Sequence, residues 1–187
     1  MPTVFFDREL CRLREVLAQM GGEVERMLDT SLAALRAGDS ELADKAIAMD
    51  RGINDLENRI INKTILLIAT NQQVAGDLRF LAASLRMAGE LERIGDLSAN
   101  LARRAKALAE FAPQTSPPDV IDDLAAMARP MPAPALNAFA ARNLAKARAV
   151  LELDDGIDGL NPPVRRRVGE EIADDGPRTH WGLEIIK

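Results

Sequence analysis

Residues 10–35 read LCRLREVLAQMGGEVERMLDTSLAAL, and this stretch decides the fold class of the chain. Its inward stripe steps by three and four residues through Leu10, Leu13, Leu17, Met20, Val24, Met27, Ser31 and Leu35. Such spacing places one stripe along a single helix. Gly21 and Gly22 weaken its middle by about 1 kcal/mol each relative to alanine, but the pattern continues through them. We predict a long amphipathic helix that stops at Gly38 and a new helix with its N-cap at Asp39.

Two more periodic segments follow the first. The second stripe runs through Leu42, Ala46, Met49, Ile53, Leu56, Ile60, Thr64 and Leu67, and its helix is expected to end at 71–73. The third begins with Leu78, Leu81, Leu85 and Ala88, and its helix is expected to continue to about Phe111. Because short connections make neighbouring helices antiparallel, we predict an up-down-up bundle of these three helices.

Composition supports an all-α fold and narrows the class of function. Of the 187 residues, 47% are apolar and only 3% aromatic, which favours helices over sheets. A net charge of −5 (24 minus 29) argues against a nucleic-acid binder, which would need a basic face. No apolar run is long enough to span a bilayer, and no signal peptide is recognised at the start. Cys11 is the only cysteine, which suits the reducing cytoplasm.

Proline divides the chain, because every proline except Pro2 lies at or beyond Pro113. We expect a first three-helix bundle over 1–112, a proline-rich irregular linker over 113–134 and a partial second bundle over 135–187. An internal repeat supports the second bundle. It pairs positions 104 apart: Ala34, Asp39, Ala43, Asp50, Ile53 and Leu56 with Ala138, Asn143, Ala147, Asp154, Ile157 and Leu160. The counterpart of the third helix does not arrive before residue 187.

Acidic and carboxamide side chains form columns on the predicted helices. The third helix carries Glu92, Asp96 and Asn100 at i, i+4 and i+8, where its inward stripe should continue. The second helix carries Asp50, Asn54 and Glu57, and the second repeat reproduces this column with Asp154, Asp158 and Asn161. Side chains stacked in this way lie along one face, next to apolar residues that we expect to be buried.

These columns have three interpretations that the sequence leaves open. Glu92 and Asp50 find no basic residue three or four positions away on their own helix, whereas Glu90 has both Arg86 and Arg93. Two carboxylates about 6 Å apart repel by roughly 2–3 kcal/mol, so the columns need a cation, a raised pKa or bases from another helix. Hard oxygen ligands suit Mg²⁺, Ca²⁺, Mn²⁺ or iron. The alternatives are a metal site, ordinary salt bridges between helices and another role for the acidic side chains.

Two stretches resemble the PhoU family, the regulatory proteins of the high-affinity phosphate transport system. They are MDRGINDLENRI at 49–60 and TNQQVAGDLRFLAASLRMAGELERIGDLSANLARR at 70–104. The resemblance implies two pseudo-symmetric three-helix bundles, each with a Glu/Asp-x₃-Asp metal motif that carries multinuclear iron or zinc in some members. Glu92 and Asp96 match this motif, Asp50 matches the acidic position of the second helix, and Asp154 and Asp158 match in the second repeat.

The resemblance also implies a function. Members are cytoplasmic, often dimeric, peripherally associated with membrane complexes and without established catalytic activity. They contact the ATPase of the phosphate ABC transporter and a phosphate-sensing histidine kinase, restraining phosphate uptake and starvation signalling when phosphate is plentiful. We therefore expect a regulatory adaptor and a homodimer, with iron or zinc at the site and Mg²⁺ or Mn²⁺ left open. The alternatives are a carboxylate-bridged metal-dependent enzyme and a purely structural helical scaffold.

The second repeat departs from the family pattern. Pro130, Pro132 and Pro134 fall where its first helix should run, and Pro162 and Pro163 interrupt its second helix. A second E-R-I-G-D motif is absent from the sequence, so its site would lack half of its ligands. We interpret the chain as a family member that is truncated or frame-disrupted in the second repeat.

Overall fold

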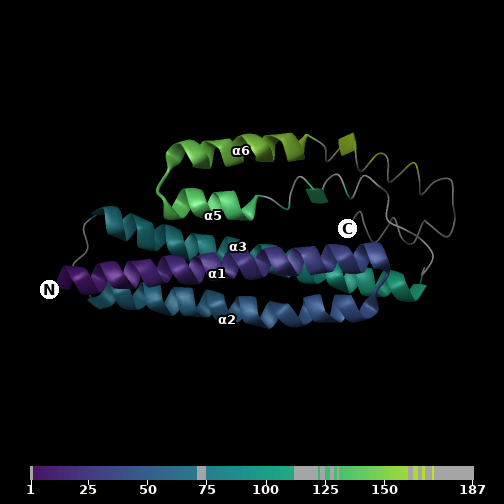
Figure 1. The fold of residues 1–187 in the computed structure, drawn as a ribbon, viewed down its shortest axis with the longest axis horizontal. Helices are drawn as coiled ribbons and strands as arrows, with labels where there is room; N and C mark the ends of the chain where they lie inside the picture. Colours follow the sequence, from purple (N-terminus) through teal and green to yellow (C-terminus); the bar gives the residue numbers. More distant parts are fainter. Residues whose placement is uncertain are drawn as a thin grey trace.

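The computed structural model is all-helical over the residues it describes (Figure 1). These are 2–70, 75–111 and 131–159, with single positions at 122, 125, 126, 129, 162, 163, 166 and 170; the side chains of 2–4, 111 and 156–158 are not described. The first part forms three long helices, α1 (Pro2–Ala37), α2 (Ser40–Thr70) and α3 (Ala75–Phe111). Two shorter helices follow, α5 (Pro132–Ala140) and α6 (Leu144–Asp158).

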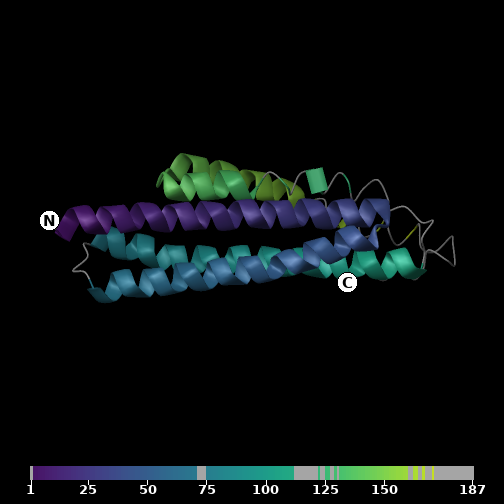
Figure 2. The same cartoon turned by 60° about the horizontal axis from the view of Figure 1, so that its bottom comes forward.

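The three long helices run up, down and up side by side, as the periodic stripes predict (Figures 1 and 2). Every stripe residue predicted for α1 is buried, from Leu10 to Leu35. In α2 the stripe is buried from Ile53 to Leu67, where it meets the other two helices in one core. The prediction for α3 is wrong at Leu78, whose side chain is 46% exposed, whereas Leu81 is fully buried.

The connection between α1 and α2 has the geometry that the sequence predicts. Gly38 adopts a positive φ of 60°, a conformation that costs a residue with a Cβ atom more than it costs glycine. The N–H of Asp39 then donates to the carbonyl of Ala34 at 3.1 Å, which closes the end of α1. The side chain of Asp39 accepts a hydrogen bond from the N–H of Leu42 at 2.9 Å. Asp39 is therefore the N-cap of α2.

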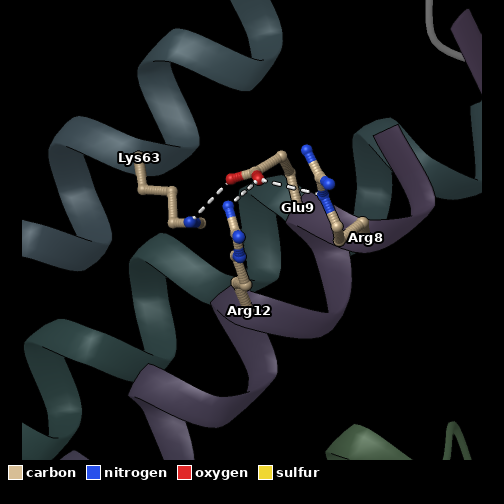
Figure 3. A network of polar contacts seen from close by, with 4 residues as sticks. All are labelled: Arg8, Glu9, Arg12 and Lys63. Carbon is tan, nitrogen blue, oxygen red and sulfur yellow. Dashed lines mark hydrogen bonds and ion pairs between the residues drawn. The ribbon is translucent and has the colours of Figure 1, made fainter. Parts of the chain in front are cut away.

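A network of charged side chains connects α1 and α2 near the N-terminal end of α1 (Figure 3). The ammonium of Lys63 donates to Oε2 of Glu9 at 2.8 Å, and Arg12 pairs with Oε1 of the same carboxylate at 2.5 Å. Arg8 lies 4.0 Å from that carboxylate. The Glu9 side chain is only 12% exposed, so this ion pair is poorly screened by water. The hydrogen bond from Lys63 lowers the pKa of Glu9 below its ordinary value, and the charges of Lys63 and Arg12 lower it further.

The lowered pKa of Glu9 predicts a dependence of stability on pH. The folded chain holds the charged carboxylate better than the unfolded chain does, so this stabilisation is present above pH 4.5 and is lost as the pH falls through the folded-state pKa. We expect Glu9→Gln to lower the free energy of unfolding at pH 7 and to have a smaller effect at pH 3. Urea denaturation at both pH values measures this difference. Glu15→Gln, at an exposed position of α1, is the control; equal losses for the two variants would contradict the prediction.

The α5–α6 hairpin repeats the α1–α2 connection with the offset of 104 residues (143 minus 39). Asn143 stands where Asp39 stands: its N–H donates to Ala138 at 2.9 Å, and its side chain accepts from the N–H of Lys146 at 3.0 Å. Arg142 takes the place of Gly38 and keeps a positive φ of 51°. The internal repeat is thus confirmed in backbone geometry at this turn.

The hairpin lies along α1, on the side of the bundle opposite α2 (Figures 1 and 2). A Cβ atom on Gly21 would lie 2.0 Å from Cδ1 of Leu136, so the glycine of α1 leaves the space that this leucine of α5 fills. The ring of Phe139 stacks on Phe80 of α3 with centroids 5.0 Å apart. Gly21 therefore serves the docking of α5.

The second repeat begins its helix earlier than expected. The sequence predicted irregular chain up to residue 134, but α5 starts at Pro132. The first N–H groups of a helix have no partner within it, so Pro132 and Pro134 fit in the first turn without losing a hydrogen bond. The first part of the expected linker, residues 113–121, and the altered ending at 171–187 lie outside the described residues.

None of the described helices combines the length and the hydrophobicity that crossing a membrane requires.

Candidate functional site

Glu92 of α3 lies close to the acidic column of α2 at the edge of the bundle core. Asp50, Asn54 and Glu57 of α2 are half-buried, because they flank the buried Ile53 on the same helix. Glu92 of α3 is half-buried as well. The sequence placed these four side chains beside the core, and the structure brings them there.

Gly95 of α3 lets α2 and α3 approach closely at this site. A Cβ atom on Gly95 would lie 3.1 Å from Cδ1 and 3.2 Å from Cγ2 of Ile53, tighter than ordinary packing. One and a half turns earlier, a Cβ atom on Gly89 would lie 4.0 Å from Oε1 of Glu57. Sequence reasoning missed this role, although a glycine in the position of an inward stripe is its signal. The close approach sets the spacing between the two acidic columns.

Replacing Gly95 with alanine tests this close approach. Alanine favours a helix by about 1 kcal/mol over glycine, but the crowding of Ile53 costs about 1–3 kcal/mol because its branched carbon cannot rotate away. We expect Gly95→Ala to lower the free energy of unfolding by about 0–2 kcal/mol, measured by urea denaturation. Gly52→Ala is the matched control: nothing lies within 4 Å of its Cβ, and we expect a gain of about 0.5–1 kcal/mol. A gain at both positions would show that the helices do not meet at Gly95.

The electrostatics of the site centre on Glu92. Its burial raises the pKa of Glu92 above the ordinary value, and the negative charges of Asp96, Glu57 and Asp50 raise it further. A hydrogen bond with the side chain of Asp96 acts in the same direction. Glu92 is therefore close enough to Asp50, Glu57 and Asp96 to be repelled by their negative charges.

Asp50 carries an unsatisfied atom in this site. Its Oδ1 is buried and has no hydrogen-bond partner. A buried acceptor without a partner costs about 1–3 kcal/mol, more when it is charged. In the described part of the chain, no ion pair joins an arginine or lysine to Asp50, Glu57 or Glu92. Ordinary salt bridges, the second interpretation of the columns, are thus not formed here, although Glu90 pairs loosely with Arg93 at 4.0 Å as expected.

Other predicted site residues are less well placed. Asp96 is exposed, and so is Asn100, whose Oδ1 accepts a hydrogen bond from Arg103 at 2.7 Å. Asn100 therefore belongs to the surface of α3, because the column turns outward along the helix. In the second repeat Asp154 is exposed on α6, and the side chain of Asp158 lies outside the described residues. Within the described residues no counterpart of Glu92 faces Asp154.

The donor chemistry of the site fits a hard cation, but its arrangement is incomplete. Carboxylate oxygens and one unpaired buried acceptor are what Mg²⁺, Mn²⁺ or iron would use, whereas zinc in proteins favours cysteine and histidine. Within the described residues no group of three or more Asp, Glu, His or Cys side chains is arranged to hold a metal ion. One reason is spacing, since Asp50 and Glu57 are about 10 Å apart along α2.

The chain is similar to known proteins both in fold and in sequence. The family model described as "PhoU domain" matches residues 17–105, which covers most of α1 and α3 and all of α2. The chain is 35% identical over 91% of its length to a phosphate-specific transport system accessory protein PhoU homolog of Rhizobium meliloti, and covers 72% of that protein. The chain belongs to the PhoU family. The resemblance inferred from the motifs is thereby confirmed.

Relatives and solved structures extend the PhoU likeness into the second repeat. A PhoU homolog of Methanothermobacter thermautotrophicus is 29% identical over 99% of the chain and 84% of its own length. The crystal structure of PhoU from Pseudomonas aeruginosa is 31% identical, with a TM-score of 0.89 over 97% of this chain and 87% of that one. PhoU from Streptococcus pneumoniae gives a TM-score of 0.84 at 25% identity, over 96% and 84%. The PhoU helical-bundle fold is therefore established for the chain.

Proposed function

We propose that the chain is a regulatory adaptor of a phosphate-specific transport system. The observation that carries this proposal is the 35% identity, over nearly the whole chain, to a relative named as an accessory protein of that system. Accessory proteins act by contact, so the proposal also favours a role without catalysis. In more detail, we propose that the adaptor restrains phosphate uptake. We also propose that it holds a phosphate-sensing histidine kinase inactive when phosphate is plentiful.

An exposed apolar patch supports contact with a partner. Ile65, Leu66 and Ile68 in the last turns of α2 are 54%, 61% and 38% exposed. Neighbouring exposed apolar residues on a soluble bundle mark interaction surfaces. We propose that this patch contributes to docking on the transporter ATPase, which would bring the chain to the membrane peripherally. A homodimer in the cytoplasm is part of the same proposal.

A metal site is the second part of the proposal. Asp50, Glu92 and Asp96 would hold the cation, with iron or zinc as the family resemblance implies and Mg²⁺ or Mn²⁺ as further candidates. The unpaired Oδ1 of Asp50 and the mutual repulsion of the carboxylates support it, since a cation would relieve both. When bound, it would supply positive charge that joins α2 to α3; the alternative, a metal-dependent enzyme, would also need a general base.

Co-purification tests the adaptor proposal. We expect the affinity-tagged chain, expressed in its own host with ample phosphate, to capture the transporter ATPase and the kinase. Leu66→Asp should reduce capture of the ATPase at least about tenfold, because it places a charge in the contact. Leu97→Asp, at a leucine of α3 that is 59% exposed, is the matched control and should leave capture unchanged. If the unaltered chain captures neither protein, the adaptor proposal is wrong.

A further inference from the structure

A surface rich in basic side chains lies across α1 and α2, near the N-terminal end of α1 (Figure 3). Its members on each helix are three, four or seven residues apart, so they share one face of that helix. The ion pair between Lys63 and Glu9, at 2.8 Å, holds the two faces side by side. We define this basic surface by Phe5, Arg8 and Arg12 of α1 and by Arg59 and Lys63 of α2.

The basic surface carries an excess of positive charge. Three of its cations lie within 4.0 Å of the single carboxylate of Glu9: Arg8, Arg12 and Lys63. With the exposed Arg59, the local charge is +3 (4 minus 1), and it is still +2 when Asp55, one turn before Arg59, is counted. The whole chain carries −5. This surface is therefore a basic region of an acidic protein, and it attracts anions.

Exposed apolar side chains accompany these cations. Phe5 is 51% exposed, and the guanidinium of Arg8 lies 5.4 Å from the centroid of its ring. Leu66 is 61% exposed and follows Lys63 by one turn, so it borders the basic surface. Leu66 also belongs to the apolar patch that we propose docks on the transporter ATPase. Apolar side chains next to cations are typical of surfaces that lie on anionic membranes.

We propose that the basic surface contacts the phosphate groups of anionic lipids in the membrane that holds the transporter. This contact rests on the proposed function, because docking of the neighbouring patch on a membrane complex brings the surface to the bilayer. Attraction to the lipid phosphates supplies most of the affinity, and Phe5 adds an apolar part among the headgroups. Four cations spread over two helices suit a layer of many mobile phosphates better than one bound anion.

Sedimentation with lipid vesicles tests this contact. The full chain is mixed at low salt with vesicles of about one-third phosphatidylglycerol in phosphatidylcholine, and with vesicles of phosphatidylcholine alone. We expect binding to the anionic vesicles only, and release as the salt concentration rises. Arg8→Glu/Arg59→Glu should bind at least about tenfold more weakly, because each basic residue contributes roughly fivefold at an anionic surface. Phe5→Ala should bind about threefold to tenfold more weakly.

A second double variant, Arg26→Glu/Arg93→Glu, is the matched control. These two arginines lie on α1 and α3 outside the basic surface, with side chains 65% and 74% exposed. The control changes the net charge by the same amount and should bind vesicles as the unaltered chain does. Both double variants keep the pair of Lys63 with Glu9, so circular dichroism should show an unchanged helix content. The proposal is overturned if the unaltered chain does not bind anionic vesicles, or if the two double variants bind alike.

Two further measurements distinguish the lipid from other anionic partners. Replacing chloride with inorganic phosphate at equal ionic strength should leave vesicle binding unchanged; release by phosphate would mean that the surface holds the free anion, and would overturn the proposal. In a detergent extract, Arg8→Glu/Arg59→Glu should still capture the transporter ATPase. Loss of this capture, with no vesicle binding by the unaltered chain, would mean that the surface contacts a protein.

The lipid contact and the adaptor role can fail separately in these experiments. If the unaltered chain captures the ATPase but does not bind anionic vesicles, the lipid contact alone is refuted. If it binds anionic vesicles but captures neither the ATPase nor the kinase, the adaptor proposal is refuted and the basic surface still binds lipid.

Discussion

Replacing Leu81 with alanine is expected to lower the free energy of unfolding by about 2–5 kcal/mol. The Leu81 side chain is fully buried and belongs to the core cluster that α1, α2 and α3 share. Alanine would leave a cavity there, and long helices packed on both sides cannot collapse into it. Urea denaturation, followed by circular dichroism, measures the loss.

The neighbouring leucines of α3 are the controls for this prediction. Leu78 is 46% exposed, so Leu78→Ala should cost less than about 0.5 kcal/mol. Leu85 is half-buried, and Leu85→Ala should fall between the two, at about 1–2 kcal/mol. A larger loss at Leu78 than at Leu81 would mean that α3 is rotated about its axis relative to the structure.

The effect of Glu92→Gln on stability is expected to change sign when a metal ion is bound. In the presence of a chelator we expect the variant to be more stable than the unaltered chain at pH 7. The folded-state pKa of Glu92 is raised, so the folded chain loses stability as the pH rises from 4.5 through that pKa, and glutamine removes this loss. With a bound cation the order should reverse. A ligand at about 100 times its dissociation constant stabilises by about 2.7 kcal/mol, and the variant forgoes most of this.

Thermal unfolding with a chelator and with added Fe²⁺, Zn²⁺, Mn²⁺ or Mg²⁺ measures both halves of the prediction. Glu90→Gln is the control, because Glu90 is exposed and should respond to neither condition. If none of these ions stabilises the unaltered chain, the metal site is refuted. If Glu92→Gln fails to stabilise the chelated protein, the carboxylates do not repel one another as the structure indicates.

The candidate site could be predicted from the sequence only in part. Spacing placed Asp50, Glu57 and Glu92 beside the core, because residues on one helical face are fixed by the 3.6-residue period. It also placed Asp96 there, whereas the side chain is exposed. Periodicity gives the face of a helix but leaves open how deeply a neighbour covers it. A glycine in the inward stripe signals that a neighbour could come close at Gly95, but that this neighbour is Ile53 of α2 follows only from the packing of the two helices.

The second repeat shows the same division. The offset of 104 residues identified Asn143 as the partner of Asp39, and the two turns share their hydrogen bonds. The prolines, in contrast, led to a wrong start for α5. Proline prevents a helix from continuing but fits its first turn, so Pro132 and Pro134 alone could not distinguish a linker from a helix start.

By itself the sequence determined the all-helical class, the C-terminal ends of the long helices and the membership of the PhoU family, since these follow from local periodicity, capping residues and linear motifs. The tertiary structure alone decided which faces are covered. In this structure Leu136 packs against Gly21, Leu78 is exposed to solvent, and the apolar face of α6 is exposed as well. Burial is a property of two surfaces that meet, and each helix encodes only its own.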